Sequence, residues 1–350
     1  ESKENIMKLM KTEEAVGQVL CHDITQIIPG VTKDAVFRKG HIITKEDIPV
    51  LLSVGKEHIY IWEKDEHMLH ENEAAQILYE MCRNEHMHPS AVKEGKIELI
   101  ADCDGLFKVD REKLRKVNSL GEMMIATRHG NTFVKKGDKL AGTRIIPLVI
   151  EKEKMERAKE ICNDGSILEI KPLQPKKAAI LTTGSEVYHG RIQDKFTPVL
   201  VEKLKEYGSE VIFHEIYDDD HEAITKGCLS AIEQGADLVL CTGGMSVDPD
   251  DKTPLAIKNT GARIVSYGAP VLPGAMFLVS YYEYKDKTIP IVGLPGCVMY
   301  AKRTIFDLAL PRLLADDFIT AEELALLGEG GLCLNCPVCT YPNCGFGKGW

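Results

Sequence analysis

Short apolar runs alternate with helix-like patterns in the second half of the chain. Residues 178–181 and 237–241 are two of these runs, and helical spacing of apolar residues follows at 197–207 and 222–234. Runs of this length that end in glycine-containing turns are typical of buried strands, and their alternation with helices is typical of a parallel sheet. The pattern predicts an α/β domain over residues 176–327, with a central, mostly parallel sheet and helices on both faces.

The rest of the chain divides into smaller parts. Residues 1–64 and 131–162 favour β structure, and we predict that they form one β-rich N-terminal domain. Residues 65–130 mix helical and strand patterns and predict an inserted α+β lobe. Residues 163–177 contain two prolines, which favour a linker, and residues 328–350 form a short Cys-rich tail.

Composition narrows the class of protein. The 350 residues exceed one typical domain, and 53 acids against 43 bases argue against a general nucleic-acid binder. No apolar run approaches the roughly 20 residues that span a membrane, so no membrane association is expected. Seven of the eleven cysteines are dispersed, and no apolar signal region opens the chain. Together these features predict a reduced, cytoplasmic protein.

Polar loops follow the two central runs. The first loop is residues 182–186, and the second loop is residues 242–247, with Asp248, Asp250 and Asp251 directly behind it. Open α/β sheets bind ligands at the carboxyl ends of their strands, and glycines let backbone N–H groups approach a phosphate. The acids are suited to a hard cation such as magnesium. The alternative is a pair of ordinary strand-to-helix turns with surface acids.

Three consecutive acids, Asp218, Asp219 and Asp220, follow the strand predicted at 210–216. They precede a helical pattern, so they are suited to capping its free N–H groups. A catalytic role is the alternative, and the sequence alone leaves both open.

Five motifs resemble the molybdopterin-binding domain that molybdenum insertase shares with molybdopterin adenylyltransferase. The motifs are more similar to those of the insertase than to those of the adenylyltransferase. They stand in the order of that family at Thr183-Gly184-Ser185-Glu186, Gly190-Arg191-Ile192-Gln193-Asp194, Asp218-Asp219-Asp220, Gly243 to Val247 with Asp251, and Gly293-Leu294-Pro295-Gly296, which precedes a predicted helix from 298 to about 314. Residues 14–20 and 136–143 extend the resemblance, which weakens between 65 and 130.

The resemblance implies a chemistry. Adenylylated molybdopterin would bind across the loops, magnesium would bridge its phosphates, and molybdate would enter as AMP leaves. It makes Asp219 and Asp251 the catalytic acids and magnesium ligands, with the register at the triple acid open by one residue. It also implies a homodimer. The residues that it assigns to the pterin are Thr182, Thr183, Gly184, Ser185, Glu186, Asp194, Thr242, Gly243, Gly244, Ser246, Pro273, Gly274, Gly293, Pro295 and Gly296.

Several positions depart from the family pattern towards less polar residues. Ser185 stands where the insertase has an acid, Phe196 where it has asparagine, and residues 273–276 lack its lysine. The insertase-like transferase therefore competes with a non-catalytic carrier that delivers molybdopterin to a molybdoenzyme. A nucleotide pyrophosphatase is a third hypothesis.

Four cysteines crowd the C-terminal tail. Cys333, Cys336, Cys339 and Cys344 form a C-x2-C-x2-C-x4-C motif, whose spacing suits an iron–sulfur cluster or zinc. The insertase family has no such tail, which predicts a contact with a redox partner or a target molybdoenzyme. Phe346 and Trp350, with glycines at 345, 347 and 349, predict a flexible, sticky end.

Overall fold

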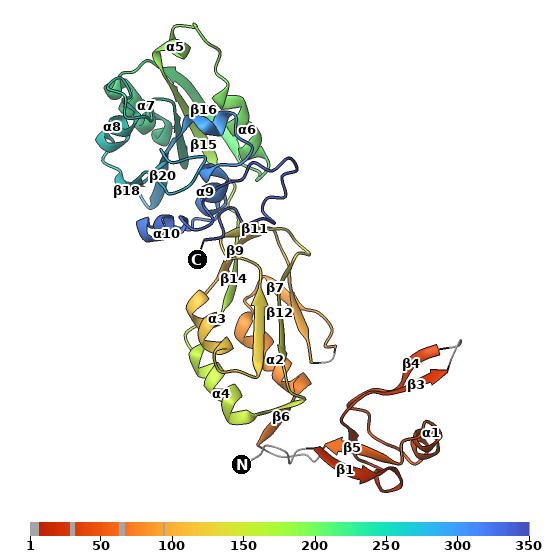
Figure 1. The fold of residues 1–350 in the computed structure, drawn as a ribbon. Coiled ribbons are helices and arrows are strands. Elements are labelled where there is room, and N and C mark those ends of the chain that lie inside the picture. The colour runs from red at the N-terminus through yellow and green to blue at the C-terminus, as the bar shows by residue number, and fades with distance from the viewer. Residues whose placement is uncertain (1–6, 29–31, 63–66, 94, 350) are drawn as a thin grey trace.

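The computed structural model describes residues 7–28, 32–62, 67–93 and 95–349. An N-terminal unit, a middle unit and a C-terminal α/β domain follow one another along an elongated molecule (Figure 1). Within the described residues, no helix combines the length and the apolar character that crossing a membrane requires.

The N-terminal unit is a three-stranded antiparallel sheet, in the order β1-β5-β2, with a hairpin and a short helix. Leu20, Leu51 and Ile61 belong to its small apolar core. Its elements are β1 (Met7–Lys11), η1 (Thr12–Glu14), β2 (Val19–Leu20), β3 (Ile24–Ile28), β4 (Thr32–Phe37), α1 (Asp47–Ser53) and β5 (His58–Trp62).

The middle unit packs three helices against sheets in the orders β10-β12-β8-β7 and β11-β9-β14. A short antiparallel pair, β6 with β13, accompanies them. The elements are β6 (Met68–His70), α2 (Glu71–Cys82), β7 (Met87–Pro89), β8 (Ile97–Ala101), β9 (Gly105–Val109), α3 (Arg111–Asn118), β10 (Met123–Thr127), β11 (Thr132–Val134), β12 (Lys139–Ile145), β13 (Val149–Glu151), α4 (Lys152–Ile161) and β14 (Leu168–Pro172).

The predicted division of the first half of the chain was wrong in one respect. Residues 131–162 join the 65–130 lobe and not the N-terminal sheet, because β12 lies between β10 and β8. Ala141 and Ile145 of β12 are buried in one core with Leu78 of α2. The alternation of polar and apolar residues predicts a half-buried strand but does not say which partner covers its apolar face.

The predicted linker also contains a strand. β14 pairs antiparallel with β9 and buries Leu168 and Ile170, so only the residues after Pro172 connect the two larger units. The two prolines favoured an irregular linker. The alternation of buried apolar and exposed polar residues before Pro172 favours a strand instead, and the strand forms.

The C-terminal domain confirms the predicted α/β fold. Its six strands have the order β16-β15-β17-β20-β19-β18, and β15, β16, β17 and β20 run parallel. Helices α6 and α9 cover one face, and α7 and α8 cover the other. The elements are β15 (Lys177–Thr183), α5 (Ser185–Tyr188), α6 (Phe196–Lys205), β16 (Glu210–Tyr217), α7 (His221–Glu233), β17 (Leu238–Thr242), α8 (Thr253–Asn259), β18 (Arg263–Tyr267), β19 (Leu278–Tyr284), β20 (Lys287–Leu294), η2 (Gly296–Met299), α9 (Ile305–Leu314) and α10 (Ala321–Leu326).

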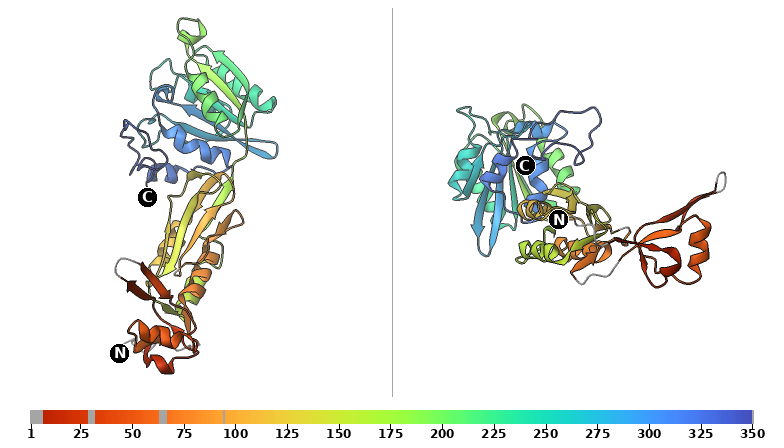
Figure 2. Two further views of the ribbon diagram at one scale, coloured as in Figure 1. Left: turned by 90° about the vertical axis from the view of Figure 1, so that its right-hand side faces the viewer. Right: turned by 60° about the horizontal axis from the view of Figure 1, so that its bottom comes forward.

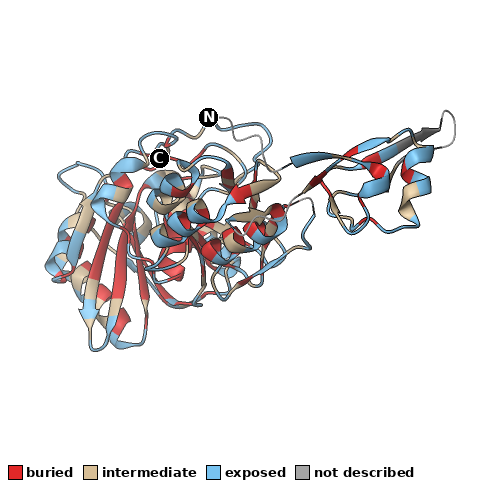
Figure 3. Ribbon diagram, turned by 90° about the horizontal axis from the view of Figure 1, so that it is seen from below, coloured by how far each residue is buried: buried red, intermediate tan, exposed pale blue. Residues whose placement is uncertain are grey.

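The middle strands of this sheet are its core. Alternate residues of β15 and β17 point to opposite faces, and both sets are buried. Figure 3 shows strands of the sheet coloured as buried. Ala178 and Ile180 face α6 and α9, whereas Ala179 and Leu181 face α7 and α8. Continuous apolar runs are required here because helices cover both faces of the sheet.

The C-terminal tail is packed onto this domain, and the predicted flexible end was wrong for Phe346. Trp350, the other aromatic residue of that prediction, lies outside the described residues. The Phe346 side chain is 5% exposed and belongs to the core between the sheet and α9. Cys333, Tyr341 and Cys344 pack against the same core, and the tail lies along the domain in both views of Figure 2. Burial of an aromatic ring outweighs the conformational freedom of the glycines around it.

Candidate functional site

Parallel pairing brings the polar loops to one edge of the central sheet. Thr182 of β15 lies opposite Thr242 of β17, and Thr242 lies opposite Leu294 of β20. The first loop, the second loop and the turn at 293–296 therefore leave the sheet side by side. This confirms that the carboxyl ends of the central strands gather the polar motifs.

Hydrogen bonds join the first two loops directly. The Thr183 hydroxyl donates to the backbone oxygen of Thr242 at 3.0 Å and lies 3.0 Å from the Thr253 hydroxyl. The Thr253 hydroxyl lies 2.8 Å from the backbone oxygen of Gly243. A Cβ atom on Gly243 would lie 2.2 Å from the Thr183 backbone oxygen, so only glycine fits there. The two loops thus form one rigid unit.

Two of the three consecutive acids at 218–220 have different roles. The Asp220 carboxylate accepts from the backbone N–H of Glu222 at 2.9 Å, which caps α7. Asp219 instead accepts from the backbone N–H of Ser185 in the first loop at 3.0 Å. The capping role is therefore confirmed for Asp220, and Asp219 is the acid that reaches the first loop.

Asp251 makes the equivalent contact in the second loop. Its carboxylate accepts from the backbone N–H of Ser246 at 2.6 Å. Both Asp219 and Asp251 are partly exposed. Within the described ranges, no three His, Cys, Asp or Glu side chains are grouped closely enough to hold a metal ion as they stand.

Asp194 is the centre of a polar cluster below the first loop. It accepts from the hydroxyls of Thr182 at 3.1 Å and Thr197 at 2.5 Å, and from the backbone N–H of Phe196 at 2.8 Å. Burial alone would raise the pKa of Asp194, but hydrogen bonds, first from Thr197, lower it overall. The carboxylate is therefore held in its charged form.

Sequence reasoning missed His214 of β16. Its Nε2 atom lies 3.1 Å from the Thr197 hydroxyl, 3.3 Å from the Thr182 hydroxyl and 3.4 Å from the Asp194 carboxylate. Thr197 was missed as well. The signal that could have found His214 was a histidine close to the carboxyl end of the strand predicted at 210–216, just before the three consecutive acids.

The other predicted residues are distributed unevenly. Gly293 lies beneath the second loop, where an added Cβ would meet the Met245 sulfur at 2.5 Å. Pro295 and Gly296 lead into the short turn η2, and Glu186 is exposed on α5. Pro273 instead accepts a hydrogen bond from the backbone N–H of Ile305, at the start of α9. The structure therefore places the 273–274 turn against α9.

One buried hydroxyl of this edge has no partner. Thr242 Oγ1 makes no hydrogen bond within the described part of the chain, although the residue is fully buried. An unpaired buried hydroxyl is costly, so a ligand oxygen at this position would be stabilising.

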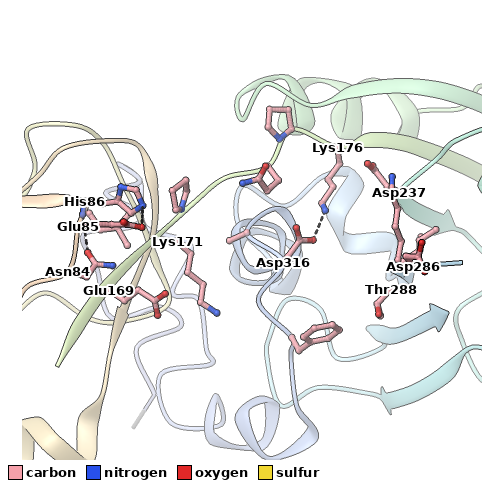
Figure 4. Close-up of a pocket in the computed structure, with 18 residues that line it drawn as sticks. Asn84, Glu85, His86, Glu169, Lys171, Lys176, Asp237, Asp286, Thr288 and Asp316 are labelled. Carbon is pink, nitrogen blue, oxygen red and sulfur yellow. Dashed lines mark hydrogen bonds and ion pairs between the residues drawn. The ribbon is translucent and has the colours of Figure 1, made fainter. Parts of the chain in front are cut away.

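A cavity of about 690 Å³ lies at the other end of the sheet (Figure 4). Lys176 and Asp237 line it where β15 and β17 begin, and Lys176 pairs with Asp316 at 2.5 Å. Ligands of open α/β sheets bind at the carboxyl ends of the strands, so this cavity is the weaker candidate.

Residues 179–315 match the family model described as a probable molybdopterin binding domain. This segment belongs to that family. Molybdopterin binding, and with it molybdenum cofactor biosynthesis, is thus the functional context of the domain. Residues 9–63 match a second model, described as a domain of unknown function.

Curated relatives each match less than half of the chain. Molybdopterin adenylyltransferase of Pyrococcus furiosus is 28% identical over 135 residues, which are 39% of this chain and 76% of that protein. A CinA-like protein of Mycobacterium tuberculosis is 36% identical over 77 residues, but these are only 18% of its length and 22% of this chain.

Solved structures of similar proteins include the tungsten cofactor synthesizing protein MoaB of Pyrococcus furiosus. It is 22% identical with a TM-score of 0.32, over 35% of this chain and 84% of that one. A molybdenum cofactor biosynthesis protein of the same organism covers 88% of this chain and 63% of its own, at 13% identity and a TM-score of 0.27.

Proposed function

We propose that the molybdopterin-binding domain binds adenylylated molybdopterin across the first and second loops and releases AMP as molybdate is inserted. The observation that carries this proposal is the single rigid edge formed by the two loops, joined through Thr183 and Thr242. It supports a ligand with adjacent phosphates, because both loops follow the carboxyl ends of neighbouring parallel strands.

The backbone N–H groups of Ser185 and Ser246 are the proposed phosphate donors. Each already donates to an anionic oxygen, of Asp219 and Asp251 respectively. A phosphate oxygen is an equivalent acceptor for both. The unpaired hydroxyl of Thr242 adds a third donor at the same edge.

The residues present fit magnesium, which the family resemblance implies. Asp219 and Asp251 supply hard carboxylate oxygens, and each uses only Oδ2 for its loop contact within the described residues. We assign the magnesium site to these two acids. When bound, the ion would neutralise phosphate charge during cleavage of the phosphoanhydride bond.

The residues of the domain supply positioning. The glycines at 243 and 244 allow the backbone to approach the pyrophosphate, and Asp194 holds Thr182 and Thr197 in place. Phe196 gives no polar group to the site, because its side chain is buried in the apolar core. Lost polarity at this position favours the carrier as the alternative function.

Adenylyl transfer to molybdopterin is a second candidate function. It is favoured by the similarity to the adenylyltransferase, which extends over 76% of that relative. In this reaction a phosphate oxygen of molybdopterin would attack the α-phosphorus of ATP and release pyrophosphate.

A direct assay separates these functions. The full chain is incubated with adenylylated molybdopterin and magnesium, with and without molybdate, and AMP is measured. Molybdate-dependent AMP release is the expected result. Binding without AMP release would instead establish a carrier, and release that ignores molybdate would establish a hydrolase. Pyrophosphate release from ATP and molybdopterin would establish the adenylyl transfer.

Replacing Asp251 tests the site itself. Asp251→Ala is expected to slow AMP release by about 100-fold while molybdopterin still binds. The exposed neighbour Asp250 offers the matched control, Asp250→Ala, which should leave AMP release unchanged. Equal rates in the two variants would remove Asp251 from the proposed mechanism.

Three further features belong to this proposal. The cytoplasmic location, expected from the dispersion of seven of the eleven cysteines, is the first. The homodimer implied by the family resemblance stays a prediction. The same holds for a redox or molybdoenzyme partner at the tail.

A further inference from the structure

The four tail cysteines line a single cavity of about 240 Å³. Lys302 and Arg303, which follow β20 and η2, form part of its wall. None of the other seven cysteines, all of which the structure describes, lines this cavity. Sequence spacing alone requires only that the four thiols are near one another along the chain, whereas the fold brings them around one space.

The domain holds the two ends of the motif in place. Leu272 donates its backbone N–H to Gly331, and Cys333 donates its own to Leu272, both at 2.8 Å. At the other end, Cys344 packs against the apolar core beside the buried ring of Phe346. The first and last cysteines are therefore positioned by protein packing.

The middle two cysteines differ from the outer two in exposure. Cys336 and Cys339 are exposed, while Cys333 and Cys344 are partly buried. No three metal-ligating side chains stand within bonding reach of one ion in the described residues. A bound metal would therefore draw the exposed pair inward against the fixed pair.

Basic side chains offset the charge that thiolates bring. Arg303 stacks over the Tyr341 ring at 4.9 Å and pairs with the buried Asp307 at 2.9 Å, which holds the guanidinium beside the cavity. Lys302 contacts the backbone oxygen of Pro337 at 3.4 Å, between the middle two cysteines.

We propose that this cavity is an iron–sulfur site ligated by Cys333, Cys336, Cys339 and Cys344. An all-thiolate set with two consecutive two-residue spacings is the pattern of bacterial cluster-binding proteins. Zinc sites more often use two separated C-x2-C pairs. This site goes beyond the proposed pterin chemistry and does not depend on it, since no residue is shared.

The test uses the full chain, purified without oxygen and then treated with ferrous iron and sulfide. Iron, zinc and acid-labile sulfide are measured per chain, and the reduced sample is examined by electron paramagnetic resonance. We expect iron and sulfide in equal amounts with a cluster signal. Zinc without sulfide, or no bound metal at all, would overturn the assignment.

Matched variants locate the site. Cys336→Ser is expected to lower the amount of iron bound per chain at least about tenfold, since a ligand is removed. Cys103→Ser replaces a partly buried thiol of the middle unit, and this variant should keep the bound iron. Before iron and sulfide are added, the Cys336→Ser chain should unfold at the same temperature as the parent, because Cys336 is exposed. Equal iron loss in both variants would mean nonspecific binding and would refute the site.

Discussion

Two adjacent glycines of the second loop have positive φ angles and crowded surroundings. Gly243 has φ +81° and Gly244 has φ +56°, and neither has room for a side chain. A Cβ on Gly244 would lie 2.8 Å from the Thr253 hydroxyl, which is the same group that binds Gly243. Glycine is therefore required at both positions for two reasons, the positive φ angle and the close contact between the two loops.

Replacing Gly243 should be costly for stability. Gly243→Ala is expected to lower the free energy of unfolding by about 3 kcal/mol, because the new methyl group meets a backbone oxygen. Gly190→Ala is the matched control, since its φ is +69° but the space around it is open. The control should cost about 1 kcal/mol from φ alone. Denaturant unfolding of both variants measures the difference, and equal losses would contradict the steric argument.

The element after β20 shows what periodicity misses. The sequence predicts one helix from 298 to about 314, but the chain forms the short turn η2 and begins α9 only at Ile305. Thr304 caps α9, with its hydroxyl accepting from the backbone N–H of Phe306 at 3.2 Å, and Asp307 completes the capping box. A capping box satisfies the free N–H groups at this point, so it sets the start of the helix.

The tail behaves as an element of the domain, and its anchor can be tested. Phe346→Ala is expected to lower the free energy of unfolding by about 3 kcal/mol, because a fully packed ring is removed from the core. Val338→Ala is the control, since that side chain is 77% exposed. Limited proteolysis should also cleave the tail faster in Phe346→Ala alone. A tail that is equally resistant in both variants would mean that Phe346 does not anchor it.

At the scale of the whole molecule, one buried carboxylate ties the middle unit to the α/β domain. Asp317 pairs with Lys108 of β9 at 2.9 Å and Lys171 of β14 at 2.8 Å. It also pairs with Arg312 of α9 at 2.6 Å. Burial alone would raise the pKa of Asp317, but these cations, first Lys171, lower it from 3.8 to about 2.

Removing this charge should loosen the junction. Asp317→Asn is expected to cost about 3 kcal/mol of stability near neutral pH, because Lys108, Lys171 and Arg312 all lose this carboxylate, although Arg312 still pairs with Glu323. Asp316→Asn is the control, since the Asp316 side chain is 56% exposed and pairs only with Lys176 among the described residues. That variant should cost less than about 1 kcal/mol. Urea unfolding of both proteins provides the measurement.

The same pair of proteins gives a pH test. Because folding lowers the pKa of Asp317, its stabilisation is fully present above its ordinary value of 3.8 and is lost as the pH falls towards about 2. The stability difference between the parent and Asp317→Asn should therefore shrink over that interval. A difference that stays constant with pH would show that the charge is not responsible.

The sequence by itself determined the α/β domain and its polar edge. Uninterrupted apolar runs such as 178–181 are required wherever helices cover both faces of a sheet, and the loops after them follow from parallel pairing. An apolar run of this kind predicts a buried strand without any knowledge of distant parts of the chain. For the same reason the positions of Thr182 and Thr242 could be predicted without coordinates.

Only the tertiary structure decided which distant segments meet. Strand partners of β12, the histidine at 214 beside Asp194, and the cavity around the four cysteines all depend on contacts between residues far apart in sequence. Apolar alternation shows that a face is buried, but the free energy of burial is nearly the same for any apolar partner that fits. Packing of the whole chain therefore selects the partner, and with it the neighbours of each polar side chain.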